Sequence, residues 1–173
     1  MEQWKIKVPV VKSSLVDYAD MNTFYRIFGK YRNLGVNCDN SKVLTKVSVD
    51  LVMGNVPFIG KVYGNSHWIG ILKLLSKNIL AKYPEFKVEH AGTLCVRNIR
   101  GSTVPSVHAY GCATDIKIGT LDQLGSNMCA KGIMEVVIPE ARRLGITCGV
   151  DFSRTDAMHL QIGKTQLLRA YPL

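Results

Sequence analysis

The chain has 173 residues, a length that suits one domain with a substantial buried core. Hydrophobic residues make up 47% of the sequence and charged residues 20%, so its composition excludes disorder over most of the chain. The net charge of +9 predicts attraction to polyanions, but the lysines and arginines are scattered without a dense basic run, which argues against specific nucleic-acid binding.

The cysteines and the first residues bear on where the protein is made. There are five cysteines, an odd number without Cys-x-x-Cys spacing: Cys38, Cys95, Cys112, Cys129 and Cys148. This pattern argues against a disulfide framework and an all-cysteine zinc site, and favours reduced, partly buried thiols. The sequence shows no signal-peptide core and no stretch of transmembrane length. We therefore expect synthesis in a cytoplasm without a secretory signal, and no membrane span.

The first third of the chain predicts three elements. Residues 5–11 alternate polar and apolar residues around a proline, which indicates an edge strand. Residues 21–34 carry aromatic and aliphatic side chains at helical spacing, with Asp20 as a cap and Gly35 as a stop. We interpret that stripe as core. Residues 42–51 place valines and a leucine on one face, as in a half-buried strand.

The middle of the chain contains the clearest helix. Glycines and a proline break up residues 54–64, which we expect to form a loop. Residues 67–82 follow, with Asn65 or Ser66 as the cap and an apolar stripe opposite several lysines. A basic amphipathic helix can lie on a membrane, but a solvated face over a core is the commoner arrangement and the one we predict.

Further strands are expected around the most informative part of the sequence. Residues 86–90 and 93–97 have the composition of two strands joined at residues 91–92, an arrangement that would carry Arg97 to the rim of the loop that follows. Residues 112–118 then alternate like a strand.

The last third continues the mixed pattern. We expect a loop over residues 121–127 and a helix over residues 129–144, interrupted at Pro139 and ended by Gly145. Residues 146–150 then have the composition of a strand. The elements together predict an α+β fold, with a mainly antiparallel sheet and helices packed around it.

Two motifs hold the residues that carry chemistry. The first reads Ser-Val-His108-Ala-Tyr-Gly-Cys-Ala-Thr-Asp115, and the second reads Asp156-Ala-Met-His159. A catalytic zinc takes three protein ligands of this kind and keeps its fourth position for water or substrate. His108, Asp115 and His159 fit that count. If residues 157–162 form a strand beside the first, the motifs meet at a common edge of the sheet.

The spacing of these motifs resembles that of the zinc peptidases of the D-Ala-D-Ala carboxypeptidase type, which include many bacteriophage endolysins. The resemblance runs from about residue 56 to about residue 163. It implies that His108, Asp115 and His159 bind Zn2+ at the sheet edge. It also implies that Asp156 is the general base, although an aspartate at this position could instead cap the following turn.

Three more residues are candidates for contact with the substrate. The family has an arginine upstream of the first motif that polarises the substrate carbonyl, and Arg97 is its counterpart here, with Arg100 as the second candidate. Arg100 and Arg154 could also bind a terminal carboxylate. Ser106 either orients its loop by turn chemistry or touches the substrate. We expect Gly111 to let the backbone pass close to the metal.

The resemblance implies a peptidase that hydrolyses stem peptides of bacterial peptidoglycan. Two activities remain open, a D-Ala-D-Ala carboxypeptidase and an L-Ala-D-Glu endopeptidase. A phage lysin would need no secretory signal, because it reaches the wall after release from the cytoplasm or as part of a phage particle. Anionic cell-wall polymers are then the expected partners of the positive charge. The alternative is a non-catalytic, zinc-containing wall-binding or virion module.

The chain departs from the family pattern in three places. Residues 1–55 have no counterpart, and we predict an extension that packs on a peptidase domain of residues 56–173. Residues 147–151 read Thr-Cys-Gly-Val-Asp where phage-like members usually have Trp-Gly-Gly. The aromatic residue that usually follows the last ligand is replaced by Leu160.

Overall fold

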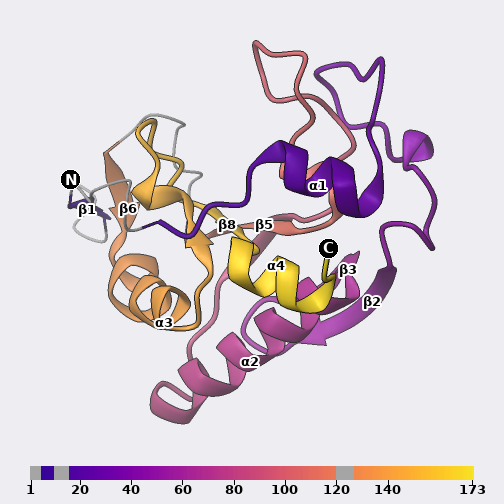
Figure 1. The fold of residues 1–173 in the computed structure, drawn as a ribbon. Coiled ribbons are helices and arrows are strands. Elements are labelled where there is room, and N and C mark those ends of the chain that lie inside the picture. Colours follow the sequence, from indigo (N-terminus) through magenta and orange to yellow (C-terminus); the bar gives the residue numbers. More distant parts are fainter. Residues whose placement is uncertain (1–4, 10–15, 120–126) are drawn as a thin grey trace.

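A computed structural model describes residues 5–9, 16–119 and 127–173 (Figure 1). It confirms the α+β architecture, because helices surround a four-stranded antiparallel sheet of order β4-β5-β8-β7. The strands of this sheet are β4 (Glu89–Gly92), β5 (Ala113–Lys117), β7 (Thr147–Cys148) and β8 (His159–Gln161). Two smaller antiparallel pairs join β1 (Lys5–Lys7) to β6 (Met128–Ala130) and β2 (Leu51–Val56) to β3 (Gly60–Asn65).

The central strands β5 and β8 bring the two sequence motifs together. They pair antiparallel in a register that places Asp115 opposite His159, so the predicted pairing of the motif strands is confirmed. Thr114 points to the helical side of the sheet, where its hydroxyl accepts a hydrogen bond from the Trp68 indole N–H (2.9 Å). Since successive side chains of a strand point to opposite faces, Asp115 lies on the other face.

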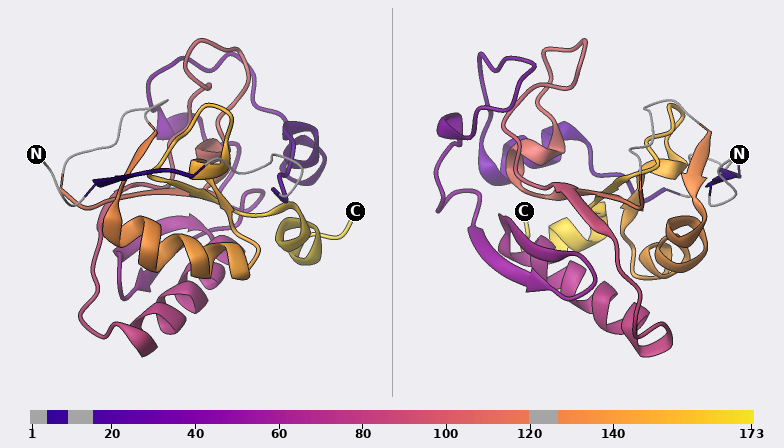
Figure 2. Two further views of the ribbon diagram at one scale, coloured as in Figure 1. Left: turned by 90° about the vertical axis from the view of Figure 1, so that its left-hand side faces the viewer. Right: turned by 180° about the vertical axis from the view of Figure 1, so that it is seen from behind.

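Helix α2 (Ser66–Lys82) covers the helical side of the sheet, as the sequence predicts. The Asn65 side chain caps it by accepting the backbone N–H groups of His67 and Trp68. Its apolar stripe is buried, with Trp68 and Leu72 fully inaccessible. Both views of Figure 2 place α2 and α3 on the same side of the sheet. No helix within the described ranges is long and apolar enough to cross a bilayer.

Helix α1 (Met21–Phe28) begins at the predicted cap but ends earlier than predicted. The Asp20 carboxylate accepts the Thr23 backbone N–H (2.9 Å). The helix ends at Gly29, whose φ of +102° leaves the helical region, and not at Gly35. The aromatic stripe is core, as predicted, since Phe24 is fully buried.

Residues 42–51 do not form the predicted half-buried strand. A short 3-10 turn, η2 (Asn40–Lys42), comes first, and the Thr45 hydroxyl then accepts the Ser48 backbone N–H (2.8 Å). Asp50 has a φ of +52°, a left-handed conformation outside the strand region. The prediction is wrong because hydrogen bonds from side chains to nearby backbone favour turns over an extended ladder here.

Residues 54–64 form most of the hairpin β2–β3, and not the predicted loop. The glycines do not break this hairpin but allow other backbone to approach it. A Cβ atom at Gly64 would lie 2.8 Å from the Gly111 carbonyl oxygen, so glycine is required for this contact. The hairpin thereby packs against the first motif at Gly111.

The two strands predicted over residues 86–97 are also corrected. β4 runs through residues 91–92, where the sequence predicts a turn, and its pairing with β5 shifts register between His90 and Gly92. The Ala-Gly pair is therefore a bulge in one strand. Residues 93–97 lie outside the regular strands. They run between residues around 39 on one side and residues 106–108 on the other.

The predicted helix over residues 129–144 is divided. Its start belongs to β6, and a π-helical turn, η4 (Ile133–Val137), precedes α3 (Ile138–Arg143). Pro139 lies in the first turn of α3, where its missing N–H is tolerated, and Gly145 ends the helical segment as predicted.

The C-terminal part holds the remaining differences. The predicted strand over residues 146–150 is reduced to β7, which leads into the 3-10 turn η5 (Gly149–Asp151). A short helix not predicted from the sequence, α4 (Lys164–Ala170), follows β8. The expected loop over residues 121–127 and the end of the predicted strand over residues 5–11 lie largely outside the described residues.

Two cysteines correct the prediction of reduced thiols. Cys38 and Cys95, which are 57 residues apart in the sequence, form a disulfide. Cys112, Cys129 and Cys148 are buried thiols, as predicted. The sequence could not show the pairing, because it depends on a Cα–Cα distance of 4.9 Å that only the fold creates.

Reducing this disulfide should lower the free energy of unfolding by about 4 kcal/mol, because the cross-link restricts the unfolded chain over a long loop. Urea unfolding with and without a phosphine reductant would measure the effect. The pair of variants Cys38→Ala and Cys95→Ala, made together, is the control that should not respond to the reductant. An identical unfolding midpoint for oxidised and reduced wild-type protein would contradict the prediction.

Residues of the N-terminal part contact the rest of the chain at two places. β1 pairs with β6, and the Tyr31 hydroxyl donates to the Ala109 carbonyl oxygen (2.8 Å). The predicted boundary after residue 55 falls within the hairpin β2–β3. The division into an extension and a peptidase domain stays a prediction.

Candidate metal centre

Three structural elements bring the predicted ligands together on the face of the sheet opposite α2. His108 comes from the 3-10 turn η3 (Val107–Tyr110), Asp115 from β5 and His159 from the first position of β8. One donor atom from each residue lies within 4.8 Å of the others. The sequence therefore identified a group of side chains that the fold places in one cluster.

The geometry of the cluster fits zinc. Asp115 Oδ1 lies 3.3 Å from His108 Nε2 and 3.2 Å from His159 Nδ1. Donor atoms held about 2.0–2.1 Å from one zinc ion at tetrahedral angles are about 3.3 Å apart. Two imidazole nitrogens and one carboxylate oxygen form a ligand set that zinc accepts, and three protein ligands leave one position for water or substrate.

Hydrogen bonds fix which imidazole nitrogen faces the cluster. The Thr93 carbonyl oxygen can only accept, so it takes the proton of His108 Nδ1 (2.8 Å) and leaves Nε2 as the ligand atom. The Gln161 amide oxygen likewise accepts from His159 Nε2 (2.8 Å) and leaves Nδ1.

Neither partner was predicted from the sequence. Gln161 is two residues beyond His159 on the same face of β8, so strand periodicity could have found it. Thr93 contributes only its backbone carbonyl, for which the sequence carries no signal.

Replacing Gln161 with leucine should weaken zinc binding by about tenfold, the lower end of the effect expected for an outer partner of a metal-ligating histidine. Gln161→Glu keeps an acceptor oxygen and should retain the wild-type affinity. Competition with a chromogenic chelator would measure both dissociation constants. Equal affinities for the leucine variant and the wild type would show that Gln161 does not orient His159.

The electrostatics of the cluster favour an ionised carboxylate. Burial alone would raise the pKa of Asp115, but hydrogen bonds and charge interactions with His108 and His159 outweigh it and hold the pKa well below its usual range. Burial lowers the pKa of His159, whereas the bond and charge of Asp115 raise it, and the net direction is upward. The cluster thus contains one carboxylate donor that is ionised and two imidazole donors in contact with it.

The turn that carries His108 is braced from several directions. The Ser106 hydroxyl accepts the His108 backbone N–H (3.2 Å) and caps η3, so the first of its two predicted roles is the one seen here. Its contact with substrate stays a prediction. Gly111 ends η3 with a φ of +66°, and its carbonyl oxygen accepts the Asn65 backbone N–H (2.9 Å). The close approach that we expected between Gly111 and the metal is therefore an approach to β3.

Aromatic residues of the N-terminal segment complete this brace. The Tyr110 ring lies 5.4 Å from the ring of Phe24, 5.6 Å from that of Phe28 and 5.1 Å from that of Tyr31, centroid to centroid. The Tyr110 hydroxyl also donates to the Gly29 carbonyl oxygen (2.9 Å). Residues before 55 therefore help to hold the turn that carries the predicted ligand His108.

Asp156 lies beside the cluster without being part of it. Its Oδ2 is 3.9 Å from His159 Nδ1. Burial raises the pKa of the Asp156 carboxyl above its usual value, and the charge of Asp115 adds to the rise, while His159 and Arg97 oppose it. A carboxylate with a raised pKa holds a transferred proton more firmly, which suits a general base.

Gly149 explains how Asp156 is placed. Its carbonyl oxygen accepts the Asp156 backbone N–H (2.9 Å), and a Cβ atom at Gly149 would collide with the Asp156 carbonyl oxygen. The chain therefore retains one glycine, Gly149, of the usual Trp-Gly-Gly stretch. It lies where its backbone meets that of Asp156. Phe152 supplies an aromatic contact, with its ring 5.7 Å from that of His159, whereas Leu160 is buried in the core.

The predicted arginines differ in their surroundings. Arg97 is half-buried, and its guanidinium donates to the Asn98 carbonyl oxygen (3.0 Å). Its charge lowers the pKa of Asp156, so it lies within electrostatic range of that carboxylate. Arg100 and Arg154 are exposed. The role of each arginine stays a prediction.

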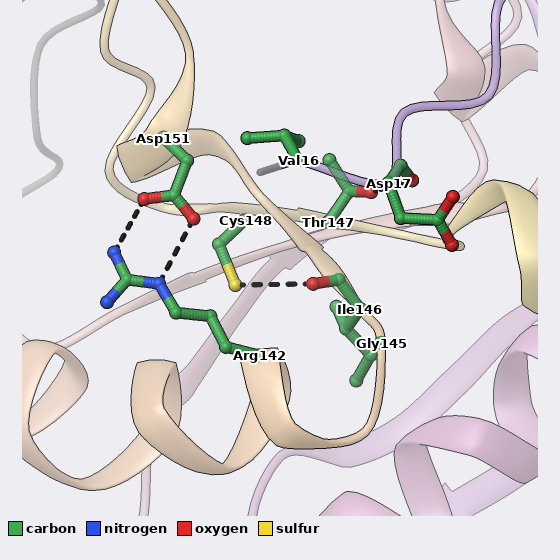
Figure 3. A pocket seen from close by; sticks show the side chains of 8 residues that line it. All are labelled: Val16, Asp17, Arg142, Gly145, Ile146, Thr147, Cys148 and Asp151. Atoms are coloured by element: carbon green, nitrogen blue, oxygen red, sulfur yellow. Dashed lines mark hydrogen bonds and ion pairs between the residues drawn. The ribbon is translucent and has the colours of Figure 1, made fainter. Parts of the chain in front are cut away.

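A pocket of about 330 Å³ lies elsewhere, beside β7 (Figure 3). In it, Arg142 donates to both carboxylate oxygens of Asp151, at 3.1 Å and 2.5 Å, so its charged groups already satisfy each other. None of the three ligands lines it. We interpret it as a surface hollow between α3 and β7 that is separate from the metal centre.

Comparison with known proteins identifies the segment that holds the site. Residues 100–162 match the family model described as D-alanyl-D-alanine carboxypeptidase, whereas no curated protein and no solved structure matches the chain. The matched segment contains the three ligands and Asp156, and begins just beyond Arg97. Over residues 100–162, the chain is therefore similar to the D-alanyl-D-alanine carboxypeptidase family.

Proposed function

We propose that the protein is a zinc-dependent peptidase that hydrolyses stem peptides of bacterial peptidoglycan. The observation that carries this proposal is the cluster of His108, Asp115 and His159, with the carboxylate of Asp156 beside it, inside the segment that matches the family. We further propose that it acts as a phage lysin at the cell wall, after release from the cytoplasm or as part of a phage particle. The sequence resemblance to phage endolysins supports this role.

The residues of the site divide the work of peptide hydrolysis. Zinc, when bound by the three ligands, supplies a Lewis acid that makes water acidic enough to lose a proton near neutral pH. Asp156 takes that proton from the attacking water on its carboxylate and later delivers it to the leaving amine. The proton therefore returns to the products, and the carboxylate is regenerated.

Arg97 has the second role in this proposal. A peptide carbonyl gains negative charge on its oxygen as water attacks, and a guanidinium aimed at that oxygen would stabilise the transition state. Arg97 is close enough for its charge to act on Asp156. We assign the exposed Arg100 to substrate binding, together with Ser106.

Mass spectrometry of peptidoglycan fragments would test the proposal. Zinc-loaded protein is incubated with purified fragments that carry the full stem peptide, beside a chelated sample. Loss of a terminal alanine identifies a carboxypeptidase, and separation of L-Ala from D-Glu identifies an endopeptidase. Both cleavages should stop when zinc is removed. Anionic wall polymers should bind the chain through its positive charge in either case.

Intact fragments in the presence of bound zinc would overturn the peptidase proposal. A protein that binds one zinc ion and sediments with cell walls, but releases no product, would instead be a non-catalytic wall-binding or virion module. Binding to walls would then persist in a variant that lacks Asp156, because affinity would not depend on a general base.

A further inference from the structure

The segment that leads to the metal turn is bonded on both sides, in an alternating pattern like that of a central strand. Toward the metal turn, the Thr93 carbonyl oxygen accepts from the His108 ring, and the Cys95 backbone N–H donates to the His108 carbonyl oxygen (3.1 Å). The Arg97 carbonyl oxygen accepts the Ser106 backbone N–H (3.0 Å). The odd-numbered residues therefore hold the ligand and its turn.

The even-numbered residues of the same segment bond to residues 34–40, from the part of the chain without a family counterpart. The Val96 carbonyl oxygen accepts the Asp39 backbone N–H (3.0 Å), and the Asn98 backbone N–H donates to the Gly35 carbonyl oxygen (2.8 Å). The Asn98 side chain also donates to the Leu34 carbonyl oxygen (2.8 Å). In Figure 1 the loop after α1 rises beside the loop that precedes η3.

Asn40 clamps this contact from the outer side. Its amide oxygen accepts the Val96 backbone N–H (3.1 Å), and its amide nitrogen donates to the Leu94 carbonyl oxygen (3.3 Å). The Cys38–Cys95 disulfide adds a covalent bond to the same contact. The backbone N–H of Cys95 donates to the His108 carbonyl oxygen. A single hydrogen bond therefore joins the disulfide to the turn that carries His108.

We propose that the Cys38–Cys95 disulfide is a positioning cross-link of the metal centre. It holds residues 34–40 against residues 94–98. The adjoining residue, Thr93, in turn fixes the ring of His108 through its carbonyl oxygen. The inference rests on the metal-binding part of the proposed function, but not on the reaction. It gives the N-terminal residues a defined role, and makes zinc affinity depend on the oxidation state of two cysteines.

The disulfide can be reduced by thiol–disulfide exchange or by a phosphine. A phosphine and one water molecule convert the disulfide to two thiols and leave a phosphine oxide, so two electrons pass from phosphorus to sulfur. Cys38 is exposed, so the bond is open to reagents in solution. Reduction removes the covalent tie but leaves the hydrogen bonds of residues 34–40 in place.

The zinc dissociation constant, measured by competition with a chromogenic chelator, tests the proposal. The oxidised wild type is compared with the phosphine-reduced wild type and with the double variant Cys38→Ala and Cys95→Ala. We expect zinc to bind about tenfold more weakly to the last two, the loss typical of a disturbed outer partner of a metal ligand. The double variant also excludes zinc capture by the newly formed thiols.

Two further variants separate positioning from general stability. Asn40→Ala removes two hydrogen bonds from an exposed side chain without touching the thiols, and should weaken zinc binding in the same direction. Ile79→Val shortens a buried side chain near the end of α2 and should lower the unfolding midpoint without changing zinc affinity.

The results have distinct meanings. Equal zinc affinity for oxidised, reduced and alanine-substituted protein would overturn the cross-link proposal and leave the metal centre standing. A loss of affinity in Ile79→Val as large as that in Asn40→Ala would also overturn it, because the effect would follow stability alone. Absence of zinc binding in the oxidised wild type would overturn the proposed function as well.

Discussion

Replacing Asp156 with alanine should lower kcat for peptide hydrolysis by about 10²- to 10⁴-fold and leave zinc binding unchanged. The range is that of a positioned general acid or base. The carboxylate lies 3.9 Å from His159 Nδ1, which places it beside the ligands without making it one of them, and burial raises its pKa toward that of a useful base. Steady-state kinetics on the identified fragment and a zinc titration of the same sample would measure the two effects.

Asp156→Glu is the matched control, because it keeps a carboxylate and changes only its reach. It should retain more activity than the alanine variant, since the group that accepts the proton is still present. An alanine variant with wild-type kcat would remove Asp156 from the mechanism. The cap role considered for this residue would then account for its position, and a drop in the unfolding midpoint without a drop in rate would confirm it.

The motifs were readable because the information for them is local. The spacing within each motif and the alternation of the strands led us to infer that the two motif strands pair, and the register of β5 and β8, with Asp115 opposite His159, confirms it. Capping residues were also readable, since Asp20 and Asn65 bond to backbone N–H groups only two or three residues away. The sequence alone can express such short-range geometry.

The contacts that support the site could not be predicted from the sequence, because they join residues far apart in the chain. Tyr31 reaches Ala109 over 78 positions, and Cys38 pairs with Cys95 over 57. The glycines misled for a related reason. Gly64 reads as a loop residue in isolation, but it serves close packing against Gly111, which lies in a different part of the sequence. A partner that is distant in sequence decides whether a glycine marks a turn or a contact.

Removing the central ligand should have the largest effect on metal binding. Asp115→Ala deletes the carboxylate that lies between both imidazoles, at 3.3 Å from His108 Nε2 and 3.2 Å from His159 Nδ1. The two histidines that remain provide one donor fewer than the three protein ligands of a catalytic zinc site. We expect the purified variant to retain almost no zinc and to show no peptide hydrolysis above background.

Thermal unfolding would measure this loss without an activity assay. Zinc at a hundredfold excess over its dissociation constant stabilises a folded protein by about 2.7 kcal/mol, so the wild type should unfold at a higher temperature when zinc is added. The Asp115→Ala variant should not respond. His67→Ala is the control, since His67 is exposed and packs against Tyr171, away from the cluster, and it should keep the full zinc-dependent rise. A zinc-dependent rise in Asp115→Ala equal to that of the wild type would place the metal on other residues, and the mechanism assigned to this cluster would fall with it.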